Sequence, residues 1–334
     1  MEVYSEKYSE FTGFVDILGG KYVDRLDEKS KKKAKEEIYE DPKERDAAIR
    51  QFRDWVKAQP HYTVCTDDTF LLAFLRRCKY SQLEARLMFD TFHTVIASKI
   101  RAWMIDIKCS AEDLAMAHLR RCAIPLPLRD PWGRRIILWR AGAFDTGKNT
   151  GYNADTFFMM WGIILMILQR EDMTQVNGYV ILQDGTGQTM KHMTYFGLER
   201  FKYTLKLFYN NFPARIKKVV YYNCGMIMEA FMAIVSPLIT QKIRDRFVVR
   251  GSMEEIYTKD IPAECLPLEY LPDDYKGKSP GNLEKVHGIF WNKVKEPAIE
   301  TKIWDLSHNF FKVDEKKRPD ADIPQAAFRK LNID

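Results

Sequence analysis

Four basic residues stand in two closely spaced pairs, an arrangement suited to binding anionic groups. Arg215 and Lys217 alternate at the start of a β-branched segment, so in an extended strand they point to the same side. Lys242 and Arg246 are spaced to share one face of a helix. Near an anionic membrane each such cation contributes about 1 kcal/mol of binding free energy. If the fold joins the pairs, they form one headgroup-binding patch; otherwise they are ordinary surface charges.

The segment from Met226 to Ile239 is apolar on nearly every face and leads into the second basic pair. Such a helix is either buried or in contact with lipid. It contains one acid, Glu229, and Pro237, which is expected to kink it. We interpret the segment as a lid over an apolar ligand, with a plain core helix as the alternative. The predicted lid residues are Met226, Ile227, Met228, Phe231, Leu238 and Ile239.

Two glycine-rich segments resemble phosphate-binding loops. The segment 142–149 nearly matches G-x-x-x-x-G-K-[ST], but Asn149 lacks the hydroxyl that holds Mg²⁺ and Gly151 delays the following helix. The segment 183–189 resembles the phosphate loop of actin-like ATPases, but we expect a helix rather than a hairpin to follow it. The glycines are therefore expected to turn one element into the next. A nucleotide-dependent enzyme built on Lys148 is the competing interpretation.

Other catalytic patterns are missing from the sequence. It has no G-x-S-x-G or H-E-x-x-H motif, and its six histidines and six cysteines show no metal-ligand spacing. Scattered cysteines and an N-terminus without an apolar segment predict a cytoplasmic protein with reduced thiols. We therefore expect no enzymatic activity, no metal and no cofactor.

The elements that would position these residues are of two kinds. The first third is helical, with apolar residues at helical spacing before Pro60 and again over 81–103, and with an N-cap offered by Thr66-Asp67-Asp68. Beyond Pro127, β-branched and aromatic segments alternate with helical ones. Strands are expected at 135–139, 178–183, 218–222 and 246–249, and helices at 153–172, 194–210 and 226–246. This alternation predicts an α/β sandwich with a mostly parallel sheet.

Length and composition set further limits. The chain of 334 residues, 46% hydrophobic and 13% aromatic, can build a sizeable core. Its longest apolar run, 157–168, is well short of the roughly 20 residues that span a bilayer. A net charge of +6 is too weak to indicate nucleic acid but suits an anionic surface. We expect an N-terminal extension at 1–24, a helical domain at 25–125, an α/β domain at 126–272 and a C-terminal extension at 273–334. This extension is expected to start as a linker and to continue as an amphipathic segment over 286–294.

Several motifs together resemble the CRAL-TRIO family of lipid-binding proteins, in particular the branch of tocopherol- and retinaldehyde-binding members and clavesins. The likeness covers about residues 35–272. Its motifs are Asp67-Asp68-x-Phe70-Leu-Leu-x-Phe74-Leu-Arg76, Phe212-Pro213-x-Arg215-x-Lys217, Ser236-Pro237-Leu-Ile-Thr-x-Lys242-Ile-x-x-Arg246 and Leu266-Pro267-x-Glu269-Tyr270. The chain departs from the family pattern at Cys78, where a second arginine is usual, at the strand end 184–187, and at Leu271-Pro272, beyond which it continues to Asp334.

The resemblance implies a pocket that shields one hydrophobic ligand beneath the helix from about residue 226. In the tocopherol and retinaldehyde members, a basic cleft binds phosphatidylinositol bisphosphates and helps to trigger lipid exchange. The matching positions are Arg215, Lys217, Lys242 and Arg246, and Arg76 matches an arginine of the same basic region. Because strand side chains alternate between faces, some candidate pocket residues are expected to point away from the ligand. The candidates are Ile137, Trp139, Phe158, Trp161, Ile181, Tyr221, Phe231, Ile234 and Val235.

We therefore predict a cytoplasmic, transiently membrane-associated protein that binds one small hydrophobic lipid, such as a retinoid, tocopherol or carotenoid. It would transfer this lipid to or between membranes, with release promoted by phosphoinositide headgroups. The alternative is a lipid-sensing adaptor that does not transfer lipid and contacts a protein partner through its C-terminal tail. We expect a monomer and no nucleic-acid partner.

Overall fold

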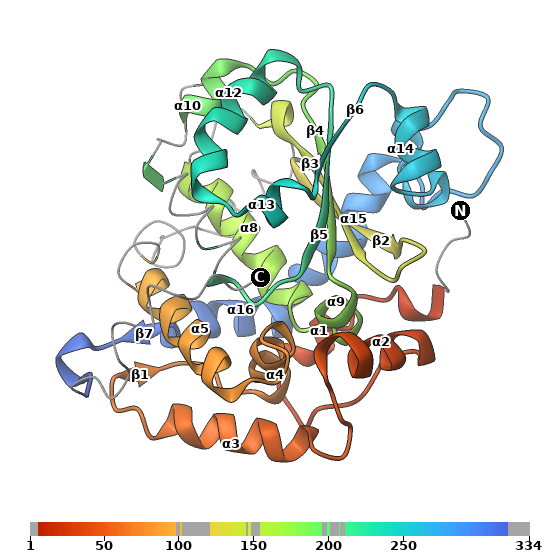
Figure 1. Cartoon of the computed structure of the whole chain (residues 1–334). Coiled ribbons are helices and arrows are strands. Elements are labelled where there is room, and N and C mark those ends of the chain that lie inside the picture. The colour runs from red at the N-terminus through yellow and green to blue at the C-terminus, as the bar shows by residue number, and fades with distance from the viewer. Residues whose placement is uncertain are drawn as a thin grey trace.

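A layer of helices lies beneath an α/β unit in the computed structural model (Figure 1). The structure describes residues 6–97, 101, 121–144, 146–147, 154–195, 199–200, 207 and 211–319. The predicted helix at 194–210 and the end of the one at 81–103 fall mostly outside these residues. The fold class predicted from the sequence, an α/β protein with a mostly parallel sheet, is confirmed.

Among the described residues, the lower layer contains four helices and two short N-terminal ones. Asp67 accepts a hydrogen bond from the Phe70 amide at 2.7 Å, and this confirms the predicted N-cap. The helix expected before Pro60 ends at Lys57. The elements of this layer are η1 (Glu6–Tyr8), α1 (Gly13–Asp16), α2 (Glu28–Ile38), α3 (Arg45–Lys57), α4 (Asp68–Arg77) and α5 (Gln82–Val95).

A five-stranded sheet forms the centre of the α/β unit, in the order β2-β3-β4-β5-β6. The predicted strands are present as β3 (Arg135–Arg140), β4 (Tyr179–Asp184), β5 (Ile216–Tyr222) and β6 (Phe247–Arg250), all parallel. The sequence did not predict β2 (Ala123–Arg129), which is antiparallel to β3. Its two prolines lack the amide hydrogen that a central strand needs, and an edge position tolerates them.

Helices cover both faces of the sheet, as the first view shows (Figure 1). The predicted helix at 153–172 is split into α8 (Ala154–Leu168) and α9 (Asp172–Asn177). The predicted lid segment forms α12 (Gly225–Val235), the turn η5 (Ser236–Leu238) and α13 (Gln241–Arg244). The remaining short elements are η3 (Ala141–Ala143), α10 (Met190–Tyr195), α14 (Met253–Lys259), η6 (Ala263–Cys265) and η7 (Leu268–Tyr270).

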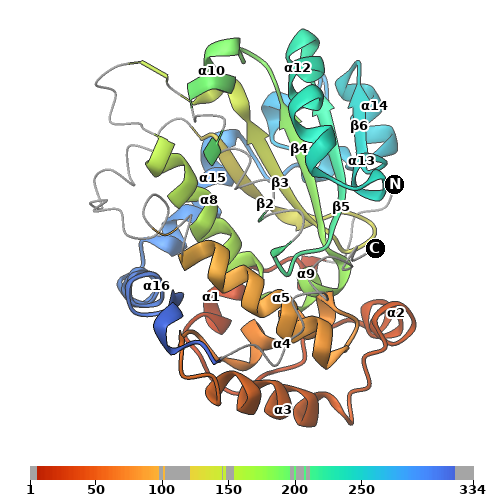
Figure 2. The ribbon, with the colours of Figure 1, turned by 60° about the vertical axis from the view of Figure 1, so that its left-hand side comes forward.

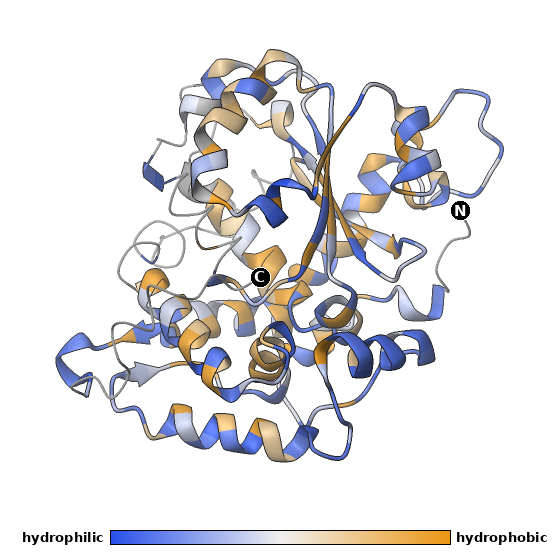
Figure 3. Cartoon of the chain, in the orientation of Figure 1, coloured by the Kyte–Doolittle hydropathy of each residue, from blue (hydrophilic) through white to orange (hydrophobic). Residues whose placement is uncertain are grey.

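The two faces of the sheet carry different side chains, because successive residues of a strand alternate. One face packs on α14 and the chain that follows it, through Ile136, Leu138, Val180, Leu182 and Val220. The other face looks toward α8 and α12 and presents Ile137, Trp139, Ile181, Val219 and Tyr221. In Figure 3 the strands are mostly hydrophobic, while α2 and α13 are hydrophilic.

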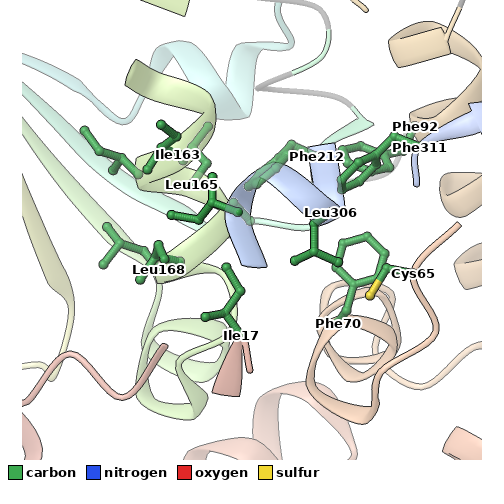
Figure 4. Close-up of a cluster of buried hydrophobic side chains, with 14 of the residues drawn as sticks. Ile17, Cys65, Phe70, Phe92, Ile163, Leu165, Leu168, Phe212, Leu306 and Phe311 are labelled. Atoms are coloured by element: carbon green, nitrogen blue, oxygen red, sulfur yellow. The ribbon is translucent and has the colours of Figure 1, made fainter. Parts of the chain in front are cut away.

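The C-terminal segment packs against the rest of its own chain. The predicted amphipathic segment is helix α15 (Leu283–Val294), followed by α16 (Pro297–Asn309), β7 (Lys312–Val313) and the turn η8 (Glu315–Lys317). Strand β7 returns to the helical layer and pairs with β1 (Tyr62–Thr63) (Figure 1), and α16 lies at the side of that layer (Figure 2). Leu306 and Phe311 join Phe70 and Phe92 in the cluster drawn in Figure 4. The tail therefore completes the hydrophobic core.

A buried polar turn between α8 and α9 joins the helical layer to the sheet. All four residues from Gln169 to Asp172 are buried. Glu171 accepts hydrogen bonds from Arg129 and Arg135, both at 2.9 Å, and Arg170 reaches Asp67 at 3.0 Å. Because each of these charges has an ionic partner, the turn is stable away from water. It fixes α4 and α9 against the start of the sheet.

Candidate functional site

Arg215 and Lys217 point to the same side of β5, as their spacing predicted. Arg215 uses one terminal nitrogen to bind the Val176 carbonyl at 2.7 Å and the other to bind Glu37 at 2.8 Å. The Lys217 ammonium lies 3.6 Å from the same oxygen of Glu37. The end of α9 thus orients Arg215, and α2 supplies a carboxylate between the two cations.

Arg246 joins this pair because β6 is the parallel neighbour of β5. Its guanidinium binds the Ile216 carbonyl at 2.7 Å, between the positions of Arg215 and Lys217. The predicted helical face shared by Lys242 and Arg246 is wrong, since α13 ends at Arg244. Lys242 lies on the exposed surface of α13, whereas Arg246 is half-buried at the start of β6.

Arg215, Lys217 and Arg246 form a basic group in which neighbouring charges lower the pKa of Lys217 and of Arg246. Burial, followed by the charge of Arg215, lowers the pKa of Lys217 to about 8. Burial and then Arg215 also lower the pKa of Arg246. Burial alone would raise the pKa of Glu37, but the charge of Lys217 and the hydrogen bond from Arg215 outweigh it and lower that pKa. An added anion would relieve the repulsion, which is the expected property of an anion-binding site.

Arg76, predicted to join the headgroup site, has a structural role instead. Its side chain is 0% exposed. It donates hydrogen bonds to Glu40 at 2.8 Å, to Gln175 at 2.8 Å and to Tyr22 at 3.0 Å, and it also binds Asp172. Each of its nitrogens is therefore engaged inside the protein, and an incoming headgroup would have to replace two buried carboxylates.

The next residue, Arg77, lies nearer the basic group, and sequence reasoning missed it. Its Nε is buried and has no hydrogen-bond partner among the described residues. Burial lowers its pKa, and the charges of Arg246 and Arg215 lower it further. Lys33 on α2 is affected in the same way, by burial and by Arg215. The sequence contained one signal for Arg77. The family pattern has an arginine at the position of Cys78, and in this chain an arginine stands one position earlier, at Arg77.

The lid segment packs on the same face of the sheet as the candidate pocket residues. Phe231, Val235 and Ile239 are buried, with the rings of Phe231 and Tyr221 centred 5.7 Å apart. Helix α12 ends at Val235, two residues before the predicted kink at Pro237. Ile227 and Met228 are half-buried, while Met226 is 87% exposed. The side chains of Ile234 and Leu238 lie outside the described residues.

The four strand residues of the predicted pocket all lie on this face, together with α8 residues. Ile137, Trp139, Ile181 and Tyr221 alternate with residues that face α14. Trp139 packs against both the hydrophobic cluster that contains the α8 residues and the one that contains Phe231 and Val235 of α12. The ring centres of Trp139 and Trp161 lie 5.7 Å apart. Phe158 is buried on α8. Contact of these residues with a ligand stays a prediction.

Comparison with known proteins now identifies the fold family. The CRAL/TRIO domain matches residues 119–270. Human alpha-tocopherol transfer protein-like is 31% identical over 279 residues, which cover 82% of this chain and 76% of that protein. The chain belongs to the CRAL-TRIO family. This is a family of lipid-binding and lipid-transport proteins.

Two further CRAL-TRIO comparisons are more distant. Clavesin-1 of Xenopus laevis is 26% identical over 244 residues, which cover 71% of each chain. The crystal structure of Sfh5 superimposes with a TM-score of 0.45 at 14% identity, over 79% of this chain and 93% of that chain. This structural likeness is too distant to inform the site.

Within the CRAL-TRIO domain, the two glycine-rich segments contact each other. A Cβ on Gly142 would lie 2.1 Å from the Thr186 carbonyl oxygen, so only glycine fits there. Asp184 orders the second segment by accepting hydrogen bonds from the Thr186 amide at 2.9 Å and the Tyr270 hydroxyl at 2.6 Å. Helix α10 follows, as expected for a turn between a strand and a helix. Lys148 lies outside the described residues.

The His, Cys, Asp and Glu side chains of the described part of the chain form no group suited to a metal ion. None of its helices is both long and apolar enough to cross a membrane. A cleft of about 320 Å³ lies beside α9, but Lys7, Glu10, Asp24 and Arg25 give it a charged lining unsuited to a lipid tail.

Proposed function

We propose that this chain binds one small hydrophobic lipid between the sheet and α12 and carries it to or between membranes. Phosphoinositide headgroups at Arg215, Lys217 and Arg246 would promote release. The lipid would be a molecule such as a retinoid, tocopherol or carotenoid, of which tocopherol appears in the name of the human relative. The protein would then be cytoplasmic, transiently associated with membranes, monomeric and without enzymatic activity.

The course of the lid segment carries this proposal. It leaves the end of β5, forms α12 over the apolar face, returns through η5 and α13, and reaches Arg246 at the start of β6 (Figure 1). Arg246 binds the Ile216 carbonyl beside Arg215 and Lys217. An anion bound by these three residues would therefore act directly on the last anchor of the lid. The proposed ligand and membrane sites would thus be connected by one stretch of chain.

Energetics favour a lid that closes on a ligand and opens on a membrane. Apolar surface removed from water contributes about 25 cal/mol per Å², so several hundred Å² of lipid offset the ordering of the lid. At a membrane, the exposed Met226 at the start of α12 would find a second apolar environment. The basic group would supply the bias toward anionic membranes.

The competing adaptor function has less support. It requires a tail that is available to a protein partner, yet α15, α16 and β7 pack on the chain's own core. Trp291 and Phe290 are fully buried there. Such a partner would have to use the exposed surface of these elements or residues beyond 319.

Mass spectrometry of the native protein, purified from a lipid-replete host, tests the ligand. We expect a stoichiometric adduct of one small lipid, which organic extraction would then identify. A ligand-free mass that persists after exposure to a mixed lipid pool would contradict the proposal.

The headgroup site is tested separately with the double variant Arg215→Ala/Lys217→Ala. We expect it to lose most of its binding to vesicles that contain phosphatidylinositol 4,5-bisphosphate. Lys276→Ala/Lys278→Ala removes the same charge from an exposed loop and serves as the control. Equal binding by the two double variants would contradict a specific site.

A further inference from the structure

Glu37 occupies the position within the basic group where an external anion would bind. One of its carboxylate oxygens lies 2.8 Å from a terminal nitrogen of Arg215 and 3.6 Å from the Lys217 ammonium. The Glu37 side chain is 45% exposed, so it reaches the group from the solvent side. It can therefore leave this position by rotating into water, without disturbing the core.

The negative charge of Glu37 does not balance the cations around it. Arg77, Arg215, Lys217, Arg246 and Lys33 influence one another's pKa or that of Glu37. Arg77 keeps a buried Nε with no hydrogen-bond partner in the described part of the chain. A ligand with more charge and more acceptor oxygens than one carboxylate would satisfy this group better.

We propose that Glu37 is an internal counter-ion that a phosphate monoester of a lipid headgroup must displace, and that this displacement lowers the affinity of the site for the headgroup. The inference rests on the proposed headgroup site and adds how its affinity is set. A monoester carries a charge of about −1.5 to −2 at pH 7 and three acceptor oxygens. A diester carries one charge, as Glu37 does, so its exchange for the carboxylate gains little.

The helix that carries Glu37 is held independently of it, so the exchange is local. The Lys33 ammonium binds the Asn177 side-chain oxygen at 3.1 Å, and Asn177 in turn donates to Ser30 at 2.8 Å. Ala34 and Ile38 are buried in the same helix. Helix α2 therefore stays docked on α9 when the Glu37 carboxylate moves away.

Glu37→Gln tests the proposal, because it keeps the side-chain shape and removes the charge. Binding is measured on phosphatidylcholine vesicles that contain phosphatidylinositol 4,5-bisphosphate, or phosphatidylinositol at the higher mole fraction that gives the same vesicle charge. We expect the variant to bind the bisphosphate vesicles about fivefold tighter than wild type does, because the headgroup no longer has to displace a carboxylate, and to keep binding them more tightly than the phosphatidylinositol vesicles. Glu36→Gln, which lies on the same helix and pairs with Lys32 at 3.9 Å, should leave the affinity for bisphosphate vesicles unchanged.

The outcomes separate this inference from the proposed site itself. If Arg215→Ala/Lys217→Ala abolishes binding to bisphosphate vesicles while Glu37→Gln keeps the wild-type affinity for them, the counter-ion role is overturned and the headgroup site stands. If the double variant binds as wild type does, the headgroup site falls first.

A soluble arm distinguishes a lipid headgroup from a free anion. Titration calorimetry with inositol 1,4,5-trisphosphate should show tighter binding to Glu37→Gln than to wild type, and inorganic phosphate should bind far more weakly. Equal binding of trisphosphate by both proteins would overturn the counter-ion role, and inorganic phosphate that binds as tightly as trisphosphate would overturn the assignment to lipid headgroups.

Discussion

Lys217 is the residue of the basic group that changes charge near neutral pH. It faces Arg215 and Arg246 beside its own strand, and Glu37 and Lys33 on α2. Burial and Arg215 lower the pKa of Lys217 to about 8, so part of its charge is lost in mildly alkaline solution. A bound phosphate stabilises the charged form, and binding above this pKa is therefore coupled to proton uptake.

We predict that binding to bisphosphate vesicles weakens as the pH rises from 7 to 9, because more of the free protein must first gain a proton at Lys217. Further ionisation of the headgroup monoesters would favour binding as the pH rises. Because these groups are already mostly dianionic above pH 7, this opposing effect is small. Lys217→Arg keeps its charge throughout this range and should show a flatter profile. A profile identical to that of wild type would show that another group titrates.

Helix α4 ends with two arginines that belong to different parts of the protein. Arg76 turns inward and links α4 to α9 and to Glu40 beyond α2, while Arg77 faces the basic group. Helical geometry separates neighbouring side chains by about 100°, so one residue step is enough to exchange these roles. The family resemblance indicated Arg76, because a sequence motif gives the position of an arginine but not the residues of α9 that this arginine contacts.

We predict that Arg76→Met costs about 3–5 kcal/mol of stability, because Glu40 and Asp172 would be left buried without their partner. Arg77→Met should cost much less, since Nε of Arg77 forms no hydrogen bond with a described residue. Urea denaturation measures the first effect, and vesicle binding should fall for Arg77→Met alone. Loss of headgroup binding in a folded Arg76→Met protein, with none in Arg77→Met, would reverse the assignment.

The strands show which elements the sequence could predict. β3, β4, β5 and β6 were found because buried parallel strands are continuous runs of β-branched and aromatic residues. β2 was missed because Pro125 and Pro127 argue against a strand unless it lies at an edge. The break between α8 and α9 was missed because Gln169–Asp172 looks like a polar helix surface, and its partners, such as Asp67 and Arg135, are distant in sequence.

The candidate site was predictable to a similar degree. Period-two spacing correctly placed Arg215 and Lys217 on one side, since a strand fixes that geometry. The spacing of Lys242 and Arg246 led to the wrong prediction that they share a helical face, because α13 ends between them. Glu37 had no signal at all, as it stands in a highly charged helix where any of several acids could face outward.

At the scale of the whole molecule, the C-terminal segment is part of the core. Trp291 is fully buried and its ring nitrogen donates to the Ala123 carbonyl at 3.4 Å. Phe290 packs edge-on against Phe11, with ring centres 5.2 Å apart. Helix α15 thereby covers β2, which would otherwise be an exposed sheet edge.

We predict that Trp291→Ala destabilises the protein by about 3–5 kcal/mol, as expected for removal of a fully buried aromatic side chain. Trp132→Ala, at a position that is 50% exposed, should change the unfolding free energy far less. Chemical denaturation of both variants measures the difference. Equal stabilities would mean that the tail is dispensable for folding.

The pairing of β1 with β7 has a consequence for biosynthesis. Tyr62 leaves the ribosome long before its partner Val313 is made. The aromatic cluster around Phe70 must likewise wait for Phe311. The helical layer therefore has an incomplete core while the residues between these partners are synthesised. During that interval the nascent protein depends on whatever shields exposed aromatic surface in the cell.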